Sequence, residues 1–255
     1  MATSTMPLAW ACYRRGELTK TLRLLDERDE KQTCEVHQLK GLVLHDLGRA
    51  GESADELERA SLLGPIQDEA RIALASSYAQ LKRIDLAREL YLQLALGQTL
   101  SSELMLQVAA GLEAIDSPQL AMKVCEWITE ADDSVAQAFY DMGFYAARSG
   151  QPLYLTEALT RRAMQLAPEN IHFRIGLVSL LVQLDRDDEA LAAFEPISSI
   201  DFRQITCVSC LLRIAEMLKR QGLPTLAALC SEQTTELKSP VGVSVPECKA
   251  SEAQP

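Results

Sequence analysis

The amino-acid sequence predicts an all-α solenoid of stacked helical hairpins. Hydrophobic residues make up 47% of the 255 residues but aromatic residues only 5%, so the apolar content comes mainly from Leu and Ala, which favour helices over strands. The 12 glycines and 10 prolines lie mostly between periodic apolar runs, as expected for helices joined by short turns. Small residues also recur at a constant spacing, which is typical of repeat architectures.

Two series of small residues define the repeat. A small residue lets two helix backbones approach closely, and neither helix of such a pair can bury its apolar stripe alone. Successive hairpins are therefore predicted to stack, each built from two helices of about a dozen residues. The first series is spaced by 34 residues throughout and the second is less strict at its end: Gly41, Ala75, Ala109 and Gly143; then Ser53, Ala87, Ala121 and Ala190.

Short turn signals lie between the two series, and longer breaks separate the units. Each unit is thus predicted to hold two helices with a tight turn between them. The turn signals fall at residues 47–49, 81–83, 115–118 and 184–187, and the breaks at 64–65, 132–133 and 167–170.

The unit that begins at Asp68 shows the pattern best. It places small residues at Ala75 and Ala87, with bulky residues at Leu74, Tyr78, Ile84 and Tyr91. This pattern resembles the tetratricopeptide repeat family, and units beginning at residues 34, 102, 136 and 171 follow it in phase. The resemblance implies a right-handed superhelical solenoid of antiparallel helix pairs, with about seven repeats between residues 6 and 237 and weaker units at both ends.

The chain is predicted to divide into a helical repeat domain, residues 1–237, and a tail, residues 238–255. The segment from Pro240 to Pro246 and the polar residues after it hold too little apolar material to pack, which favours a disordered tail. A short strand at residues 241–245 that docks elsewhere is the alternative.

Charge and cysteine usage narrow the functional class. With 25 basic and 36 acidic residues, the formal net charge of −11 disfavours nucleic acid and anionic membranes as partners. It favours a neutral or basic partner. An odd number of scattered cysteines, seven, is typical of reduced thiols. We find neither a signal-peptide pattern nor an apolar run of the ~20 residues that span a bilayer, so a cytoplasmic protein is expected.

No motif predicts catalysis, a cofactor or a metal. Cys207 and Cys210 form a CxxC motif, but no strand signal precedes it and no second CxxC or histidine lies near it. Buried helix cysteines are therefore favoured over a redox or metal role. His37 and His45 lie two helical turns apart with Gly41 midway, too far to share a metal ion. Acidic runs at residues 132–133 and 187–189 are interpreted as helix starts, where acidic side chains favour the helix dipole.

The family resemblance also implies a binding surface. In that family the first helix of each repeat lines a concave groove, and a peptide or helical segment of another protein is the expected occupant. Aromatic side chains there would act as anchors. A shift of one position would instead make these residues part of the core between repeats. The groove residues are Leu42, Ile72, Leu106, Tyr140, Phe144, Ile175 and Ser179.

The expected partner is neutral or basic and supplies apolar anchors. Members of the family that grip the acidic tails of chaperones do so with a clamp of Lys, Arg and Asn side chains. The only asparagine here, Asn170, lies between repeats, so binding of acidic chaperone tails is disfavoured. The alternatives are a structural subunit that assembles through its edges and a thiol- or metal-regulated module.

Overall fold

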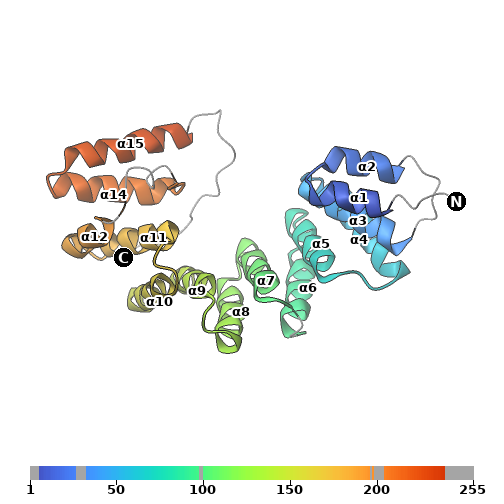
Figure 1. Cartoon of the computed structure of the whole chain (residues 1–255). Helices are drawn as coiled ribbons and strands as arrows, with labels where there is room; N and C mark the ends of the chain where they lie inside the picture. The colour runs from blue at the N-terminus through green and yellow to red at the C-terminus, as the bar shows by residue number, and fades with distance from the viewer. Residues whose placement is uncertain (1–5, 27–32, 98–99, 196, 198–203, 239–255) are drawn as a thin grey trace. The chain divides into compact units, whose positions relative to one another are not determined.

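A computed structural model of the chain describes residues 6–26, 33–97, 100–195, 197 and 204–238. The regular structure of these residues is helical throughout, with no strand, so the predicted all-α class is confirmed (Figure 1). No helix in these ranges is both long and apolar enough to cross a membrane. The helices are α1 (Met6–Arg14), α2 (Leu18–Asp26), α3 (Cys34–Asp46), α4 (Ala50–Leu63), α5 (Asp68–Gln80), α6 (Ile84–Leu96), α7 (Ser102–Ala114), α8 (Pro118–Ala131), α9 (Ala136–Arg148), α10 (Leu153–Leu166), α11 (Ile171–Gln183), α12 (Asp187–Phe194), α14 (Val208–Arg220) and α15 (Pro224–Lys238).

The helices belong to two compact units, Met1–Val124 and Cys125–Pro255, whose boundary falls inside α8. In the first unit α1–α2, α3–α4 and α5–α6 form hairpins, and α3, α5 and α7 stack in succession. In the second unit the hairpins are α9–α10, α11–α12 and α14–α15, and α11 packs against both α10 and α14. Helices thus pair in the order that the sequence predicts. The tail predicted from residue 238 lies outside the described residues, apart from Lys238 at the end of α15.

The turn inside each described helix pair contains one residue with a positive φ angle. Glycine adopts this left-handed conformation without the steric cost that a Cβ atom brings, and Asp tolerates it better than most other residues. The same turn geometry therefore recurs with different residues, which is the structural counterpart of the sequence repeat. These residues are Gly16, Gly48, Gly150 and Gly222, with φ of 72–73°, and Lys82, Asp116 and Asp185, with φ of 62°, 57° and 56°.

The small residues of the repeat lie where two helices touch. A Cβ atom on Gly41 of α3 would overlap the side chain of Leu57 in α4. At the same contact Ser53 Oγ donates a hydrogen bond to the carbonyl oxygen of Gly41 at 2.9 Å. In the second unit Gly143 of α9 faces α10, where a Cβ atom would lie 3.3 Å from Leu159 Cβ. The predicted close approach of the paired helices is confirmed at these contacts.

Candidate protein-binding surface

One face of α9 combines aromatic and acidic side chains. Gln137, Tyr140, Asp141 and Phe144 are spaced by three or four residues, which places them on one side of the helix. Gln137 is exposed and the other three are half-buried. This face, called the α9 face below, therefore offers two rings and a carboxyl group at the surface of the second unit.

The two aromatic residues of the α9 face have different surroundings. The Tyr140 ring stacks on Phe173 of α11, with ring centroids 4.7 Å apart. It also lies over Gly176 of α11, where a Cβ atom would overlap it. Tyr140 thus contributes to the packing between two hairpins as well as to the surface. Phe144 meets the ring of Tyr145 edge-on at 5.6 Å, on its own helix.

Asp141 is the charged residue of the α9 face, and the sequence analysis did not name it. Its Oδ1 accepts a hydrogen bond from Gln137 Nε2 at 2.7 Å. Burial raises the pKa of Asp141 to about 6, and the hydrogen bond from Gln137 opposes this rise only in part. Among the described residues, no lysine or arginine forms an ion pair with this carboxyl group. The α9 face therefore holds a carboxyl group that no ion pair of the described residues neutralises.

The corresponding residues of α11 are covered. Ile175 and Ser179 are only 4% and 3% exposed, and Ile175 belongs to the hydrophobic core of the second unit. Ser179 Oγ accepts a hydrogen bond from Arg213 Nη1 of α14 at 2.8 Å. In the described structure, these two predicted groove residues therefore pack between hairpins.

The three predicted groove residues of the first unit also differ in exposure. Leu42 of α3 and Ile72 of α5 are buried, and Leu42 packs in a core cluster with Leu57 and Leu74. Leu106 of α7 is half-buried. Of the residues predicted to bind a partner, Leu106, Tyr140 and Phe144 thus reach the surface most. Their role in binding remains a prediction.

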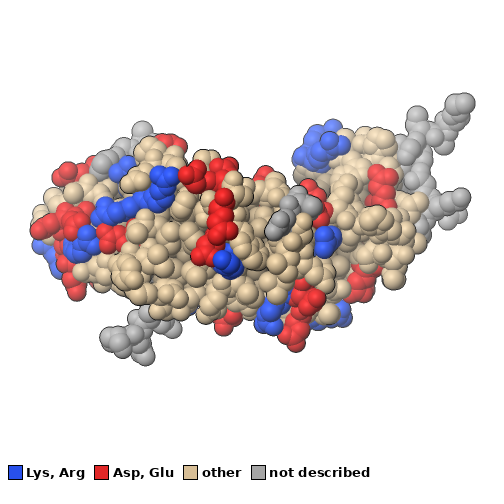
Figure 2. Space-filling view, turned by 90° about the horizontal axis from the view of Figure 1, so that it is seen from below, with Lys and Arg blue, Asp and Glu red and all other residues tan. Residues whose placement is uncertain are grey.

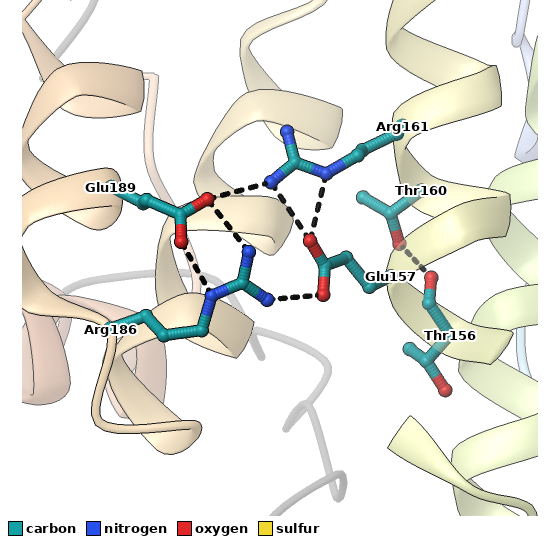
Figure 3. Close-up of polar contacts among 6 residues, drawn as sticks. All are labelled: Thr156, Glu157, Thr160, Arg161, Arg186 and Glu189. Atoms are coloured by element: carbon teal, nitrogen blue, oxygen red, sulfur yellow. Dashed lines mark hydrogen bonds and ion pairs between the residues drawn. The ribbon is translucent and has the colours of Figure 1, made fainter. Parts of the chain in front are cut away.

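A network of ion pairs joins hairpins α9–α10 and α11–α12 (Figure 3). Arg186 Nη1 donates to Glu157 Oε2 of α10 at 2.6 Å, and its Nε and Nη2 each lie 2.7 Å from an oxygen of Glu189. Arg161 Nε donates to Glu157 Oε1 at 2.8 Å. Burial opposes the ionisation of Glu157, but the hydrogen bonds from Arg186 and Arg161 outweigh it and lower its pKa.

The acidic run at residues 187–189 does lie in the first turn of α12, as predicted. Two of its side chains, however, pair with arginines. Asp187 accepts two hydrogen bonds from Arg220 of α14, at 2.7 and 2.8 Å, and Glu189 joins the network of Figure 3. These side chains link one hairpin to the next, a role that helix-start propensity alone does not reveal.

Histidine gives no metal site in the described residues, and the face drawn in Figure 2 shows no large patch of one charge. His37 is buried, and its Nδ1 lies 2.5 Å from Glu56 Oε2 of α4. No group of three or more metal-ligating side chains occurs within the described ranges. On the face drawn in Figure 2, acidic and basic side chains are interspersed in small groups. The α9 face consequently stands out by its combination of rings and carboxyl group.

Solved structures resemble this arrangement of hairpins. The crystal structure of a tetratricopeptide repeat protein from Parabacteroides merdae aligns with a TM-score of 0.67, covering 92% of this chain and 92% of that chain at 13% identity. The chain has the tetratricopeptide repeat fold. Pseudomonas aeruginosa pilF aligns with a TM-score of 0.62 over 80% of this chain and 91% of that one, at 15% identity. MamA from Desulfovibrio magneticus aligns with a TM-score of 0.54, covering 66% of this chain and 94% of that chain at 18% identity.

By sequence alone, no family model and no curated protein matches the chain. The resemblance to the tetratricopeptide repeat family was nevertheless visible in the repeated small and bulky residues. The small residues recur because they lie where paired helices touch. Asp141 was missed because the groove positions were taken from the family pattern, although its place next to Tyr140 and four residues after Gln137 puts it on the same face.

Proposed function

We propose that the chain is a non-enzymatic scaffold that captures a peptide or helical segment of another protein on the α9 face. The observation that carries this proposal is the position of Phe144, Tyr140 and Asp141 at the surface of one helix, where the next hairpin leaves them half-buried. Aromatic residues at a partly exposed face are the usual anchors of protein recognition.

The carboxyl group of Asp141 on the α9 face favours a partner segment that carries a basic residue. Asp141 would pair with a lysine or arginine of the bound segment, because the described chain provides no cation for it. A cation at that place can also lie against the Phe144 ring. The overall net charge of −11 supports the encounter with a basic segment. The proposed partner therefore combines an apolar side chain with a basic one.

Selection from a random peptide library displayed on phage, followed by affinity measurements, tests this function. We expect the selected peptides to contain an apolar residue and a nearby Lys or Arg. Phe144→Ala should weaken their binding about tenfold or more, since anchor residues dominate such interfaces. Asp141→Asn should weaken it as well. Tyr154→Ala serves as the matched control, because Tyr154 of α10 is 73% exposed and lies outside the α9 face.

A charge exchange separates recognition from nonspecific attraction. If the basic residue of a peptide meets Asp141, then Asp141→Lys abolishes binding of that peptide, and a peptide with Glu in place of the basic residue binds again. The assignment of the α9 face is wrong if Phe144→Ala and Asp141→Asn bind as tightly as the original chain. It is also wrong if Tyr154→Ala weakens binding equally.

A second function, assembly into a larger complex through an edge, is favoured by the hairpin α14–α15. This hairpin exposes Leu212, Leu226 and Leu229 by 36% to 45%, and burial of these side chains against a partner would remove apolar surface from water. Light scattering over a range of concentrations tests this alternative. Association that increases with concentration, and that Leu226→Glu together with Leu229→Glu abolishes, would support it; a monomer at every concentration would argue against self-association.

A further inference from the structure

The sulfur atoms of Cys207 and Cys210 meet at the start of α14. Cys207 is the N-cap residue of this helix, and its Sγ accepts a hydrogen bond from the backbone N–H of Cys210 at 3.4 Å. The two Sγ atoms are 2.8 Å apart. Both cysteines are reduced in the structure. A disulfide bond is about 2.0 Å long, so closing it requires the sulfurs to approach by less than ~1 Å.

The surroundings give the two thiols different roles. Cys207 is half-buried, so a small reagent can reach it, whereas Cys210 is buried and packs in the core of the second unit. At the N-terminus of a helix, backbone N–H groups and the helix dipole stabilise a thiolate over a thiol. Ser209 Oγ lies 3.2 Å from Cys207 Sγ and can add a hydrogen bond to that thiolate. Cys207 is therefore placed as the attacking thiol and Cys210 as the one that resolves the product.

The other described cysteines lack this combination. Cys12, Cys125 and Cys230 are buried, and burial raises the pKa of the Cys230 thiol to about 11. Cys34 is the closest match, since it is half-buried in the first turn of α3, but its Sγ lies 3.7 Å from the carbonyl oxygen of Pro65. Cys34 therefore provides a control thiol at a helix start without a neighbouring cysteine in contact.

We propose that Cys207 and Cys210 form a reversible dithiol–disulfide pair that exchanges with small disulfides of the glutathione type. The Cys207 thiolate attacks one sulfur of glutathione disulfide, forms a mixed disulfide and releases one glutathione thiolate. Cys210, after losing its proton to solvent, attacks the Cys207 sulfur and releases the second glutathione thiolate. The pair loses two electrons and two protons, and two molecules of reduced glutathione result. This inference is independent of the proposed partner binding.

The test is equilibration of the full chain in buffers of reduced and oxidised glutathione, followed by acid quenching, alkylation and peptide mapping. Trypsin cleaves after Arg203 and Arg213, so both cysteines fall in one peptide, residues 204–213. We expect this peptide to pass from a doubly alkylated form to an unalkylated form that is two hydrogen atoms lighter than the dithiol. Returning the protein to reduced glutathione should reverse the change.

Variants separate the two roles. Cys210→Ser should retain glutathione on Cys207, because the resolving thiol is missing, and Cys207→Ser should lose the internal disulfide completely. Cys34→Ser should leave the reaction unchanged. Circular dichroism checks that each variant keeps its helix content, and the mapping of the unaltered chain tests the proposal without any variant. The proposal is overturned if the unaltered chain forms no 207–210 disulfide at any glutathione ratio, or if Cys210→Ser carries no glutathione on Cys207.

Discussion

Helices α9 and α11 begin consecutive hairpins of the second unit, yet their corresponding residues have different environments. In α9, Tyr140 and Phe144 are half-buried and share a face with Asp141. In α11, Ile175 and Ser179 are almost completely buried. The same repeat positions are thus partly surface in one hairpin and core in the next.

The cause of this difference is the helix that packs on α11. Arg213 of α14 donates a hydrogen bond to Ser179, and apolar residues of α14 join Ile175 in the core of the second unit. Arg174 is the only Lys, Arg, Asp or Glu in α11, whereas α9 carries Asp141 and Arg148. A repeat position therefore indicates which side of a helix a residue occupies, but the neighbouring hairpin determines whether that side can receive a partner.

The largest effect that tests this comparison is the loss of a buried side chain in α11. Ile175→Ala should lower the free energy of unfolding by about 3 kcal/mol, because it removes apolar contacts and leaves a cavity in the core. Phe144→Ala on α9 should lower it by about 1 kcal/mol, since the ring is only half-buried. Denaturation in urea measures both. If both variants lose the same free energy of unfolding, Ile175 and Phe144 are equally packed, and the proposed difference between α9 and α11 is wrong.

The next effect concerns the carboxyl group of α9. The pKa of Asp141 is about 6 in the folded chain and lies near 3.9 in an unfolded one. Because the folded state binds the proton more tightly, ionisation of Asp141 costs stability as the pH rises from 4 through 6. Asp141→Asn should therefore raise the free energy of unfolding by about 2 kcal/mol at pH 7.

The pH dependence is the control for this prediction. The gain from Asp141→Asn should shrink as the pH falls through 6 and vanish near pH 4, where the carboxyl group is protonated in both states. Thermal unfolding from pH 4 to pH 7.5 measures it. A gain that is independent of pH would show that the pKa of Asp141 is the same in the folded and unfolded chain. A loss at pH 7 would show that the folded chain stabilises the carboxylate. Either result would argue against an open site for a partner's cation.

A smaller effect is expected from the hydrogen bond that covers α11. Ser179→Ala should lower the free energy of unfolding by about 1 kcal/mol, the usual contribution of such a bond. A double-mutant cycle with Arg213→Ala isolates it. If Ser179→Ala and Arg213→Ala lower stability additively, the hydrogen bond contributes nothing and α14 covers α11 through apolar contacts alone.

The sequence predicts the hairpins well because their determinants are local. Small residues such as Gly41 and Ser53 allow two helices of one hairpin to approach closely. A turn glycine such as Gly48 allows the positive φ angle that joins these helices within a few residues. Exposure is different, since it depends on contacts between hairpins. Nothing in the spacing around Ser179 shows that Arg213, 34 residues later, will reach it.

For the candidate surface and the cysteine pair too, the sequence predicts the position of a residue but not its exposure. Phe144 was predicted to line the groove, and this stays a prediction, whereas the importance of Asp141 depends on burial and on the lack of an ion pair within the described residues. The CxxC spacing was visible, but it favoured two buried helix cysteines. The structure places Cys207 at the N-cap, half-buried, because α14 begins only at Val208. The sequence places the start of a helix only to within one or two residues. For α14 that difference decides whether Cys207 lies inside the helix or at its N-cap, where its thiol can react.

The smallest effects are expected at the turns of the two compared hairpins. The turn of α9–α10 has Gly150 at φ 73°, and that of α11–α12 has Asp185 at φ 56°. Gly150→Ala should lower the free energy of unfolding by about 1 kcal/mol, because a Cβ atom is unfavourable in this conformation. Asp185→Gly relieves the same strain but increases the entropy of the unfolded chain, so a gain of only about 0.5 kcal/mol or less is expected. Thermal unfolding of both variants measures these changes. A loss of stability for Gly150→Ala with a gain for Asp185→Gly would show that the two hairpins share one turn geometry and differ only in what covers them. A loss of stability for Asp185→Gly would instead mean that the Asp185 side chain itself stabilises its turn.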